Sequence, residues 1–219
     1  MSTKYVLTGD ASPKKEKPTE WGKALFDENY QSMVGAYAGN QTLFKNSVEL
    51  VEVLKSNNIL KDNIKVCEIG SGPARNLQYI YAANNSINFV SNDLWLEATI
   101  SQMHPEMKEL IDSGQYEFYA EDSLDFTTNR KFDLDLFISS DHLMHVDYEP
   151  VAKILDNVND NWKPKYILLR EIKKEHEKPS HPRLYHNYDI FDKNYDMIFE
   201  KTSDNAPEYF IRIYRRKND

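Results

Sequence analysis

Short apolar runs alternate with amphipathic segments along most of the chain after residue 60. The runs are rich in β-branched and aromatic residues and too short for helices, so they predict strands. These strands are expected at Ile64–Ile69, Ile87–Val90, Tyr116–Ala120, Leu134–Ser139, Tyr166–Arg170, Met197–Thr202 and Tyr209–Arg215. Helices are expected between them at Asn76–Ala83, Leu96–Ile111 and Pro150–Asn161. Alternating strands and helices predict a parallel sheet with helices on both faces.

The last two apolar runs are joined only by the polar turn SDNAPE. So short a connection cannot hold a crossover helix, and it predicts an antiparallel hairpin at the edge of the sheet. The expected fold class is therefore α/β, a three-layer sandwich around a seven-stranded mixed sheet with an antiparallel C-terminal hairpin.

The N-terminal part differs in texture from the rest. Residues 1–20 are rich in Lys, Pro and small polar residues and predict a flexible arm. From Trp21 to Asn57 the pattern is helical, and its second half has apolar residues at helix spacing: Leu43, Phe44, Val48, Val51 and Leu54. We therefore divide the chain into an arm (1–20), a helical cap (21–60) and one α/β domain (61–219).

Composition narrows the picture further. The 219 residues are 40% hydrophobic and 12% aromatic, as expected for one folded domain with a sizeable core. There are 27 Lys and Arg against 35 Asp and Glu, so a net charge of -8 gives no global attraction to nucleic acid. The single cysteine, Cys67, cannot form an internal disulfide and is expected to be buried. No apolar stretch has the length of a secretory signal or a membrane span, so we expect a cytoplasmic protein without a membrane partner.

Candidate chemistry begins at VCEIGSGPARN, residues 66–76, where an acidic residue precedes a glycine loop. Glu68 stands two residues before Gly70, and Gly72 follows. Such a loop between strand and helix lets backbone approach a ligand closely and directs free N–H groups at a negative group. A dinucleotide site is disfavoured because Arg75 stands where the third glycine of G-x-G-x-x-G is needed.

Here the sequence resembles the class I, Rossmann-like S-adenosylmethionine-dependent methyltransferase superfamily, whose first motif is an acidic residue, any residue, Gly, any residue, Gly. The resemblance implies S-adenosyl-L-methionine as cofactor, with its methionine carboxylate at the glycine loop. It assigns cofactor contacts to Glu68, Gly70, Ser71 and Gly72. Ala74, where the family often has a third glycine, is small enough to keep the turn.

Further cofactor residues follow at the ends of the next strands. Asp93 ends the second strand, where the family's acidic residue binds the ribose hydroxyls, and Leu94 and Trp95 offer an apolar surface for adenine. Packing under the following helix is an equal alternative for Trp95. After the third strand, the resemblance places Asp122 at the adenine amine and Ser123 beside it. Glu121 is the rival for Asp122, and an ordinary helix cap is the plain alternative.

The segment from Phe132 to Glu171 resembles the fourth strand, active-site loop, helix and fifth strand of small-molecule methyltransferases. It places Ser139 at the cofactor, and it brings Asp141, His142 and His145 to the same edge of the sheet. Methyl transfer needs alignment more than covalent chemistry, but a hydroxyl or protonated amine acceptor must lose a proton. His142 and His145 are the candidate bases, with Asp141 as orienting partner or alternative base. The histidine pair lacks a third ligand, so we expect no metal.

The leading hypothesis is an S-adenosylmethionine-dependent methyltransferase acting on a small-molecule O or N acceptor. A non-catalytic cofactor-binding or partner module of the same fold is one alternative. A protein or RNA methyltransferase docking through the Lys-rich arm and the tail IRIYRRK is another, although SSDH replaces the Asn/Asp-Pro-Pro-Tyr signature of base methylation. The loop from His176 to Phe191 is expected to select the acceptor, whose identity the sequence leaves open together with the oligomeric state.

Overall fold

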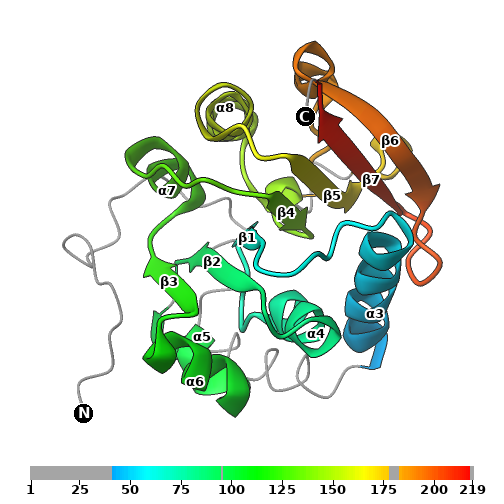
Figure 1. Ribbon diagram of the computed structural model, residues 1–219. Coiled ribbons are helices and arrows are strands. Elements are labelled where there is room, and N and C mark those ends of the chain that lie inside the picture. The colour runs from blue at the N-terminus through cyan, green and yellow to red at the C-terminus, as the bar shows by residue number, and fades with distance from the viewer. Residues whose placement is uncertain (1–40, 95, 178–182, 218–219) are drawn as a thin grey trace.

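The computed structural model describes residues 41–94, 96–177 and 183–217. Its centre is a sheet of seven strands in the order β3-β2-β1-β4-β5-β7-β6 (Figure 1). The strands are β1 Lys65–Ile69, β2 Asn88–Asp93, β3 Tyr116–Ala120, β4 Leu136–Ser140, β5 Tyr166–Ile172, β6 Tyr195–Thr202 and β7 Tyr209–Arg216. All seven predicted strands are thereby confirmed, with ends that differ from the prediction by at most three residues.

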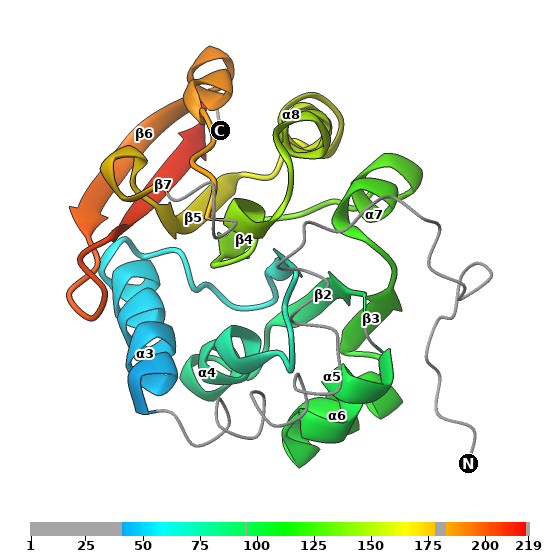
Figure 2. The same cartoon turned by 180° about the vertical axis from the view of Figure 1, so that it is seen from behind.

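Helices cover both faces of the sheet, as Figures 1 and 2 show from opposite sides. They are α3 Gln41–Ser56, α4 Arg75–Ala83, α5 Leu96–Gln102, α6 Pro105–Ser113, α7 Ser123–Asn129 and α8 Tyr148–Asp156. Short 3-10 helices η1 Leu143–His145, η3 Lys174–His176 and η4 Asp189–Lys193 and a π-helix η2 Asn157–Trp162 complete the described part. None of the helices in these ranges is both long and apolar enough to cross a membrane.

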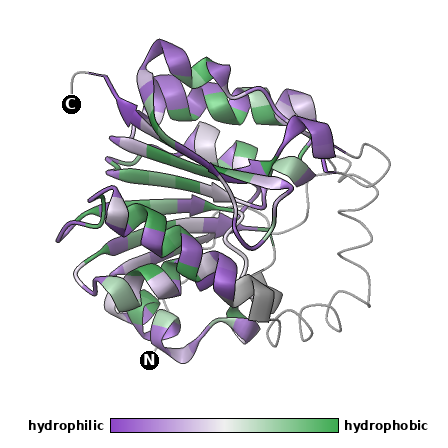
Figure 3. Cartoon of the chain, turned by 90° about the vertical axis from the view of Figure 1, so that its right-hand side faces the viewer, coloured by the Kyte–Doolittle hydropathy of each residue, from purple (hydrophilic) through white to green (hydrophobic). Residues whose placement is uncertain are grey.

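Alternating strand residues feed two separate cores. Val66 and Leu168 point to the face packed by α3, α4 and α6, whereas Cys67 and Leu169 point to the face packed by α7 and α8. Figure 3 shows the sheet edge-on, with apolar strands between the two helical layers. The three-layer sandwich and the burial of Cys67 are confirmed.

The topology creates a single switch point. Strands β1 to β5 are all parallel, and β1 lies between β2 and β4. The chain therefore runs outward on one side of β1 through β2 and β3, and on the other side through β4 and β5. The carboxyl ends of these five strands share one edge, and a ligand of an open α/β sheet binds at such a reversal.

The C-terminal hairpin forms as predicted. β7 is antiparallel to both β5 and β6 and inserts between them, so the sheet is mixed and β6 forms its edge. Glu49 of α3 ties this hairpin to the helical layer: its carboxylate accepts hydrogen bonds from Ser203 Oγ at 2.6 Å and from the Asp204 backbone N–H at 2.7 Å, and it pairs with Lys201 at 2.8 Å.

Three helical predictions need correction. The expected helix Leu96–Ile111 is two helices, because Pro105 has no N–H to continue a helix and instead begins α6 behind His104, whose ring caps it. Helix α7 was not predicted, and the helix expected at Pro150–Asn161 ends its α-helical part at Asp156. Helix α3 confirms the helix predicted for the second half of residues 21–57; the arm and residues 21–40 lie outside the described residues.

Candidate functional site

The glycine loop leaves β1 in left-handed backbone conformations. Gly70, Gly72 and Ala74 have φ of 59°, 51° and 60°, and helix α4 begins directly after Ala74 without a side-chain cap. Among the described residues, no atom lies within 4 Å of the position that a Cβ on Gly72 would take. The loop therefore presents an open stretch of backbone beside the start of α4, as the motif requires.

Asp93 faces this loop from the end of β2. Its Oδ2 accepts a hydrogen bond from the backbone N–H of Gly72 at 2.9 Å. The side chain of the following residue, Leu94, is 50% exposed. Trp95 lies outside the described residues. The structure thus brings the predicted ribose carboxylate and one predicted apolar residue to the glycine loop.

Glu68 connects the loop to the helical layer. Its buried carboxylate accepts a hydrogen bond at 2.6 Å from the side-chain nitrogen of Asn76, whose oxygen accepts one from Ser47 Oγ at 2.7 Å. The second oxygen, Oε2, is buried and has no hydrogen-bond partner in the part of the chain that the structure describes. Burial is the main reason that the pKa of Glu68 rises to about 8.

The predicted adenine residues lie at the start of α7. Asp122 is its N-cap and accepts a hydrogen bond from the Asp125 N–H at 2.8 Å, so the plain capping role is realised. Its rival Glu121 pairs with Arg130. Ser123 Oγ accepts a hydrogen bond at 3.1 Å from the side chain of Asn92.

His142 lies across the glycine loop. Its ring packs so closely on Gly70 that a Cβ there would stand 2.0 Å from Nδ1, and its Nε2 lies 2.7 Å from Ser123 Oγ. Burial, with a smaller effect from the charge of His145, lowers the pKa of His142 to about 3. The ring is therefore neutral at neutral pH. It lies between Gly70, at the predicted methionine end of the cofactor site, and Ser123, at the predicted adenine end.

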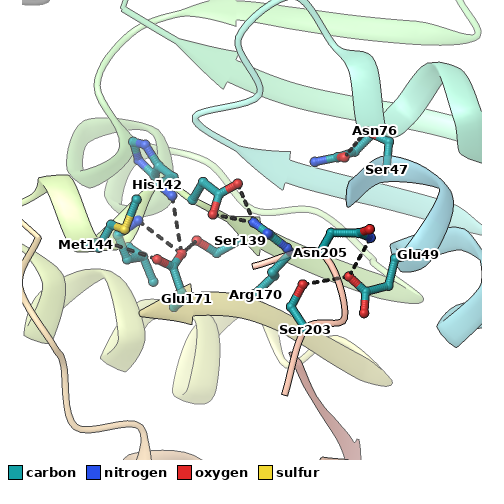
Figure 4. A network of polar contacts seen from close by, with 12 residues as sticks. Ser47, Glu49, Asn76, Ser139, His142, Met144, Arg170, Glu171, Ser203 and Asn205 are labelled. Atoms are coloured by element: carbon teal, nitrogen blue, oxygen red, sulfur yellow. Dashed lines mark hydrogen bonds and ion pairs between the residues drawn. The ribbon is translucent and has the colours of Figure 1, made fainter. Parts of the chain in front are cut away.

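Glu171 shapes the loop that carries the histidines, although no sequence motif singles it out. Its carboxylate accepts hydrogen bonds from Ser139 Oγ at 2.6 Å and from the backbone N–H groups of His142, Leu143 and Met144 at 3.4, 3.1 and 3.2 Å (Figure 4). Burial is the main reason that the pKa of Glu171 rises to about 7. The Ser139 hydroxyl, predicted at the cofactor, is fully buried and engaged here instead.

Asp141 takes a different partner from the one expected. Both of its oxygens lie 2.5 Å from Nη1 of Arg170, a side chain that is only 1% exposed. The His142 ring contacts Ser123, and the role of Asp141 as orienting partner or alternative base stays a prediction. Asp141 has φ of 57°, a strained conformation for a residue with a side chain, directly after β4.

His145 ends the 3-10 helix η1, one turn after His142, and its backbone N–H donates to the carbonyl of His142 at 2.9 Å. Within the described ranges, no three His, Cys, Asp or Glu side chains gather as a metal site would require. The catalytic candidates therefore share one short loop, held from below by Glu171.

Comparisons with known proteins address the fold. No protein-family model and no curated protein matches the sequence. Among solved structures, magnesium protoporphyrin IX methyltransferase from Synechocystis with bound SAH is similar at a TM-score of 0.67 and 14% identity, over 89% of this chain and 97% of that one.

Two further structures are similar in the same way. An O-methyltransferase family protein from Burkholderia thailandensis has a TM-score of 0.61 and 16% identity, over 80% of this chain and 57% of that one. The methyltransferase domain of a bacterial Hen1 has a TM-score of 0.59 and 11% identity, over 80% of this chain and 100% of that one. At these identities the likeness shows the fold, which is the Rossmann-like one of the class I methyltransferases.

Proposed function

We propose that this chain, which has the Rossmann-like fold of class I methyltransferases, binds S-adenosyl-L-methionine and methylates an O or N atom of a small molecule. The observation that carries the proposal is the carboxylate of Asp93 turned toward the open backbone at Gly72. A carboxylate at the end of the second strand, beside a glycine loop, is the arrangement that grips a ribose at a switch point.

Other side chains fit the cofactor part by part. The backbone around Gly72 and the start of α4 suits a carboxylate, and Leu94 offers an exposed apolar surface to a purine ring. The unpartnered Oε2 of Glu68 suits an ammonium group, because a buried polar atom without a partner is costly. The ring of His142 against Gly70 must turn aside to expose the whole loop.

When bound, the cofactor would supply an activated methyl group on a sulfonium centre. The chain's own residues would align the acceptor, exclude water and manage the proton that the acceptor releases. In this proposal the proton chemistry belongs to the loop of Asp141, His142 and His145. With a pKa of about 3, the His142 ring is neutral at neutral pH and is a weak base. It can accept a hydrogen bond from the hydroxyl or amine of the methyl acceptor.

Calorimetric titration with S-adenosyl-L-methionine tests cofactor binding. We expect saturable binding by the wild-type chain and a loss of at least tenfold in affinity in Asp93→Ala, with Asp112→Ala, a change at an exposed carboxylate of α6, as the matched control. Asp93→Asn separates charge from shape. Absence of binding at millimolar cofactor would refute the proposal.

Turnover is tested separately by release of S-adenosylhomocysteine. Cofactor binding without release, across a broad panel of small hydroxyl and amine acceptors, would favour the non-catalytic alternative. Release only with protein or RNA acceptors would reject the small-molecule part of the proposal and keep the cofactor part.

A further inference from the structure

The buried guanidinium of Arg170 has an unused edge. Its Nη1 is taken by both oxygens of Asp141, but Nε and Nη2 are shielded from solvent and have no hydrogen-bond partner among the described residues. These two nitrogens share one side of the planar group, and two parallel N–H groups on one side match the two oxygens of a carboxylate. A buried cation with unpaired donors is costly, so a ligand that pairs them is favoured.

The surroundings suit an anion with an apolar body. The guanidinium carbon lies 4.6 Å from the ring centroid of Tyr209, so an aromatic wall backs the charged group. Arg183 is a second cation at this place, since its charge acts on both Asp141 and Tyr209. Asp141 balances one of the two arginines, and Glu171, whose pKa is about 7, offsets part of the other. A partial positive charge remains, in a protein whose net charge is -8.

Arg170 lies outside the expected footprint of the cofactor. It pairs in register with Ser140, the last residue of β4, and β4 separates β5 from the glycine-loop strand β1. Two inter-strand steps place it about 10 Å from β1, the strand that ends just before Gly70. It points to the same face of the sheet as Glu68, because Arg170 and Glu68 each lie two residues after a strand residue that packs under α3 and α4, Leu168 and Val66.

We propose that Arg170, with Arg183 and the ring of Tyr209, forms a subsite for a carboxylate group of the methyl acceptor. The claim that the ligand is the methyl acceptor rests on the proposed function, but anion binding at this subsite can be measured without turnover. The proposal means that the methyl acceptor is a carboxylic acid. In it, Asp141 holds the Arg170 side chain in place.

The test uses the full chain with S-adenosylhomocysteine and two probes, benzoate and the uncharged benzamide, each titrated with detection by nuclear magnetic resonance. We expect millimolar binding of benzoate and at least tenfold weaker binding of benzamide. Arg170→Met should weaken benzoate at least tenfold, and Arg170→Lys should lie between because it keeps the charge and loses the fork. Arg212→Met, at a partly exposed arginine paired with Glu200 on the adjacent strand, is the control that should bind as wild type does.

Removing Arg170 leaves the carboxylate of Asp141 without its ion-pair partner. Arg183→Met breaks no buried ion pair and is therefore the second variant. We expect it to weaken benzoate binding severalfold. Equal binding of the two probes, or benzoate binding that neither variant changes, overturns the inference. A loss of S-adenosylhomocysteine affinity in Arg170→Met with benzoate binding retained also overturns it, since Arg170 would then serve the cofactor. Benzoate binding without any binding of S-adenosylhomocysteine would reject the proposed function and keep the anion site.

Discussion

The imidazole ring of His142 lies against the α-carbon of Gly70, so close that a methyl group there would stand 2.0 Å from Nδ1. Gly72, two residues on, has a similar φ but no described atom within 4 Å of such a methyl group. A side chain at Gly72 would therefore meet backbone strain alone, whereas a side chain at Gly70 would also collide with the ring of His142.

Gly70→Ala and Gly72→Ala should differ in stability for this reason. Each change forces a side chain into the left-handed region at a cost of about 1 kcal/mol, and Gly70→Ala also displaces the buried ring of His142. We expect the free energy of unfolding, measured in urea, to fall at least twice as far in Gly70→Ala.

The double variant Gly70→Ala/His142→Ala supplies the control. It should recover the excess loss of Gly70→Ala over Gly72→Ala, because the colliding ring is gone. If Gly70→Ala proves no worse than Gly72→Ala, the close packing of the ring on the loop is wrong.

Glu171→Gln should loosen the loop that carries the histidines. An amide offers one accepting oxygen where the carboxylate offers two. Either the Ser139 hydroxyl and the Leu143 N–H, which share Oε1, or the Met144 N–H, which uses Oε2, therefore lose their acceptor. A cost of about 2 kcal/mol is expected. Hydrogen exchange should quicken at the amides of residues 142–144 and stay unchanged in helix α6.

Ser139→Ala is the matched variant, since it removes one donor and leaves the carboxylate intact. It should cost about 1 kcal/mol and leave the backbone amides protected. Equal exchange rates in Glu171→Gln and in the wild type would contradict the role of Glu171 as the support of this loop.

The strands were predictable because each is a short run of β-branched and aromatic residues, and the break at Pro105 follows from the chemistry of proline and could have been predicted too. Helix α7 has few residues and little apolar periodicity, and its one clear sign is the capping residue Asp122. Of the candidate site, Gly70, Gly72 and Asp93 could be singled out because the motif that contains them is local in sequence, and the structure brings Gly72 and Asp93 into contact.

Arg170 and Glu171 were not found, because their partners are distant in sequence. Both end an apolar strand, which is a signal in itself, but Asp141 and Ser139 meet them only because β4 and β5 pair in register. Strand adjacency comes from packing, and a single sequence does not encode it locally.

Glu49→Ala should detach helix α3 from the C-terminal hairpin. The buried carboxylate accepts hydrogen bonds from Ser203 and Asp204 and pairs with Lys201, so its removal leaves buried donors unpaired. Burial raises the pKa of Glu49, but these contacts outweigh it and the pKa falls below its usual value. We expect a loss of about 3 kcal/mol in the free energy of unfolding.

Glu52→Ala, at an exposed carboxylate on the same helix, should change the free energy of unfolding by less than about 0.5 kcal/mol. Similar losses in both variants would mean that helix α3 is destabilised by the loss of any of its glutamate side chains. The contacts of Glu49 with the C-terminal hairpin would then have no special role.

The protonation of His142 links the site to pH. Its pKa of about 3 in the folded chain lies below the ordinary value of 6.5, so the unfolded chain takes up the proton first as the pH falls. The contribution of the neutral, buried ring to folding is therefore complete above pH 6.5 and is lost progressively as the pH falls from there toward 3.

In nuclear magnetic resonance titrations the ring of His142 should keep its neutral shifts down to about pH 4. Comparing the pH dependence of unfolding with His142→Gln isolates this group: the two curves should diverge from neutrality downward, with the wild type losing stability more steeply. A normal titration of His142 near pH 6.5 would show that the ring is solvated and has left the glycine loop.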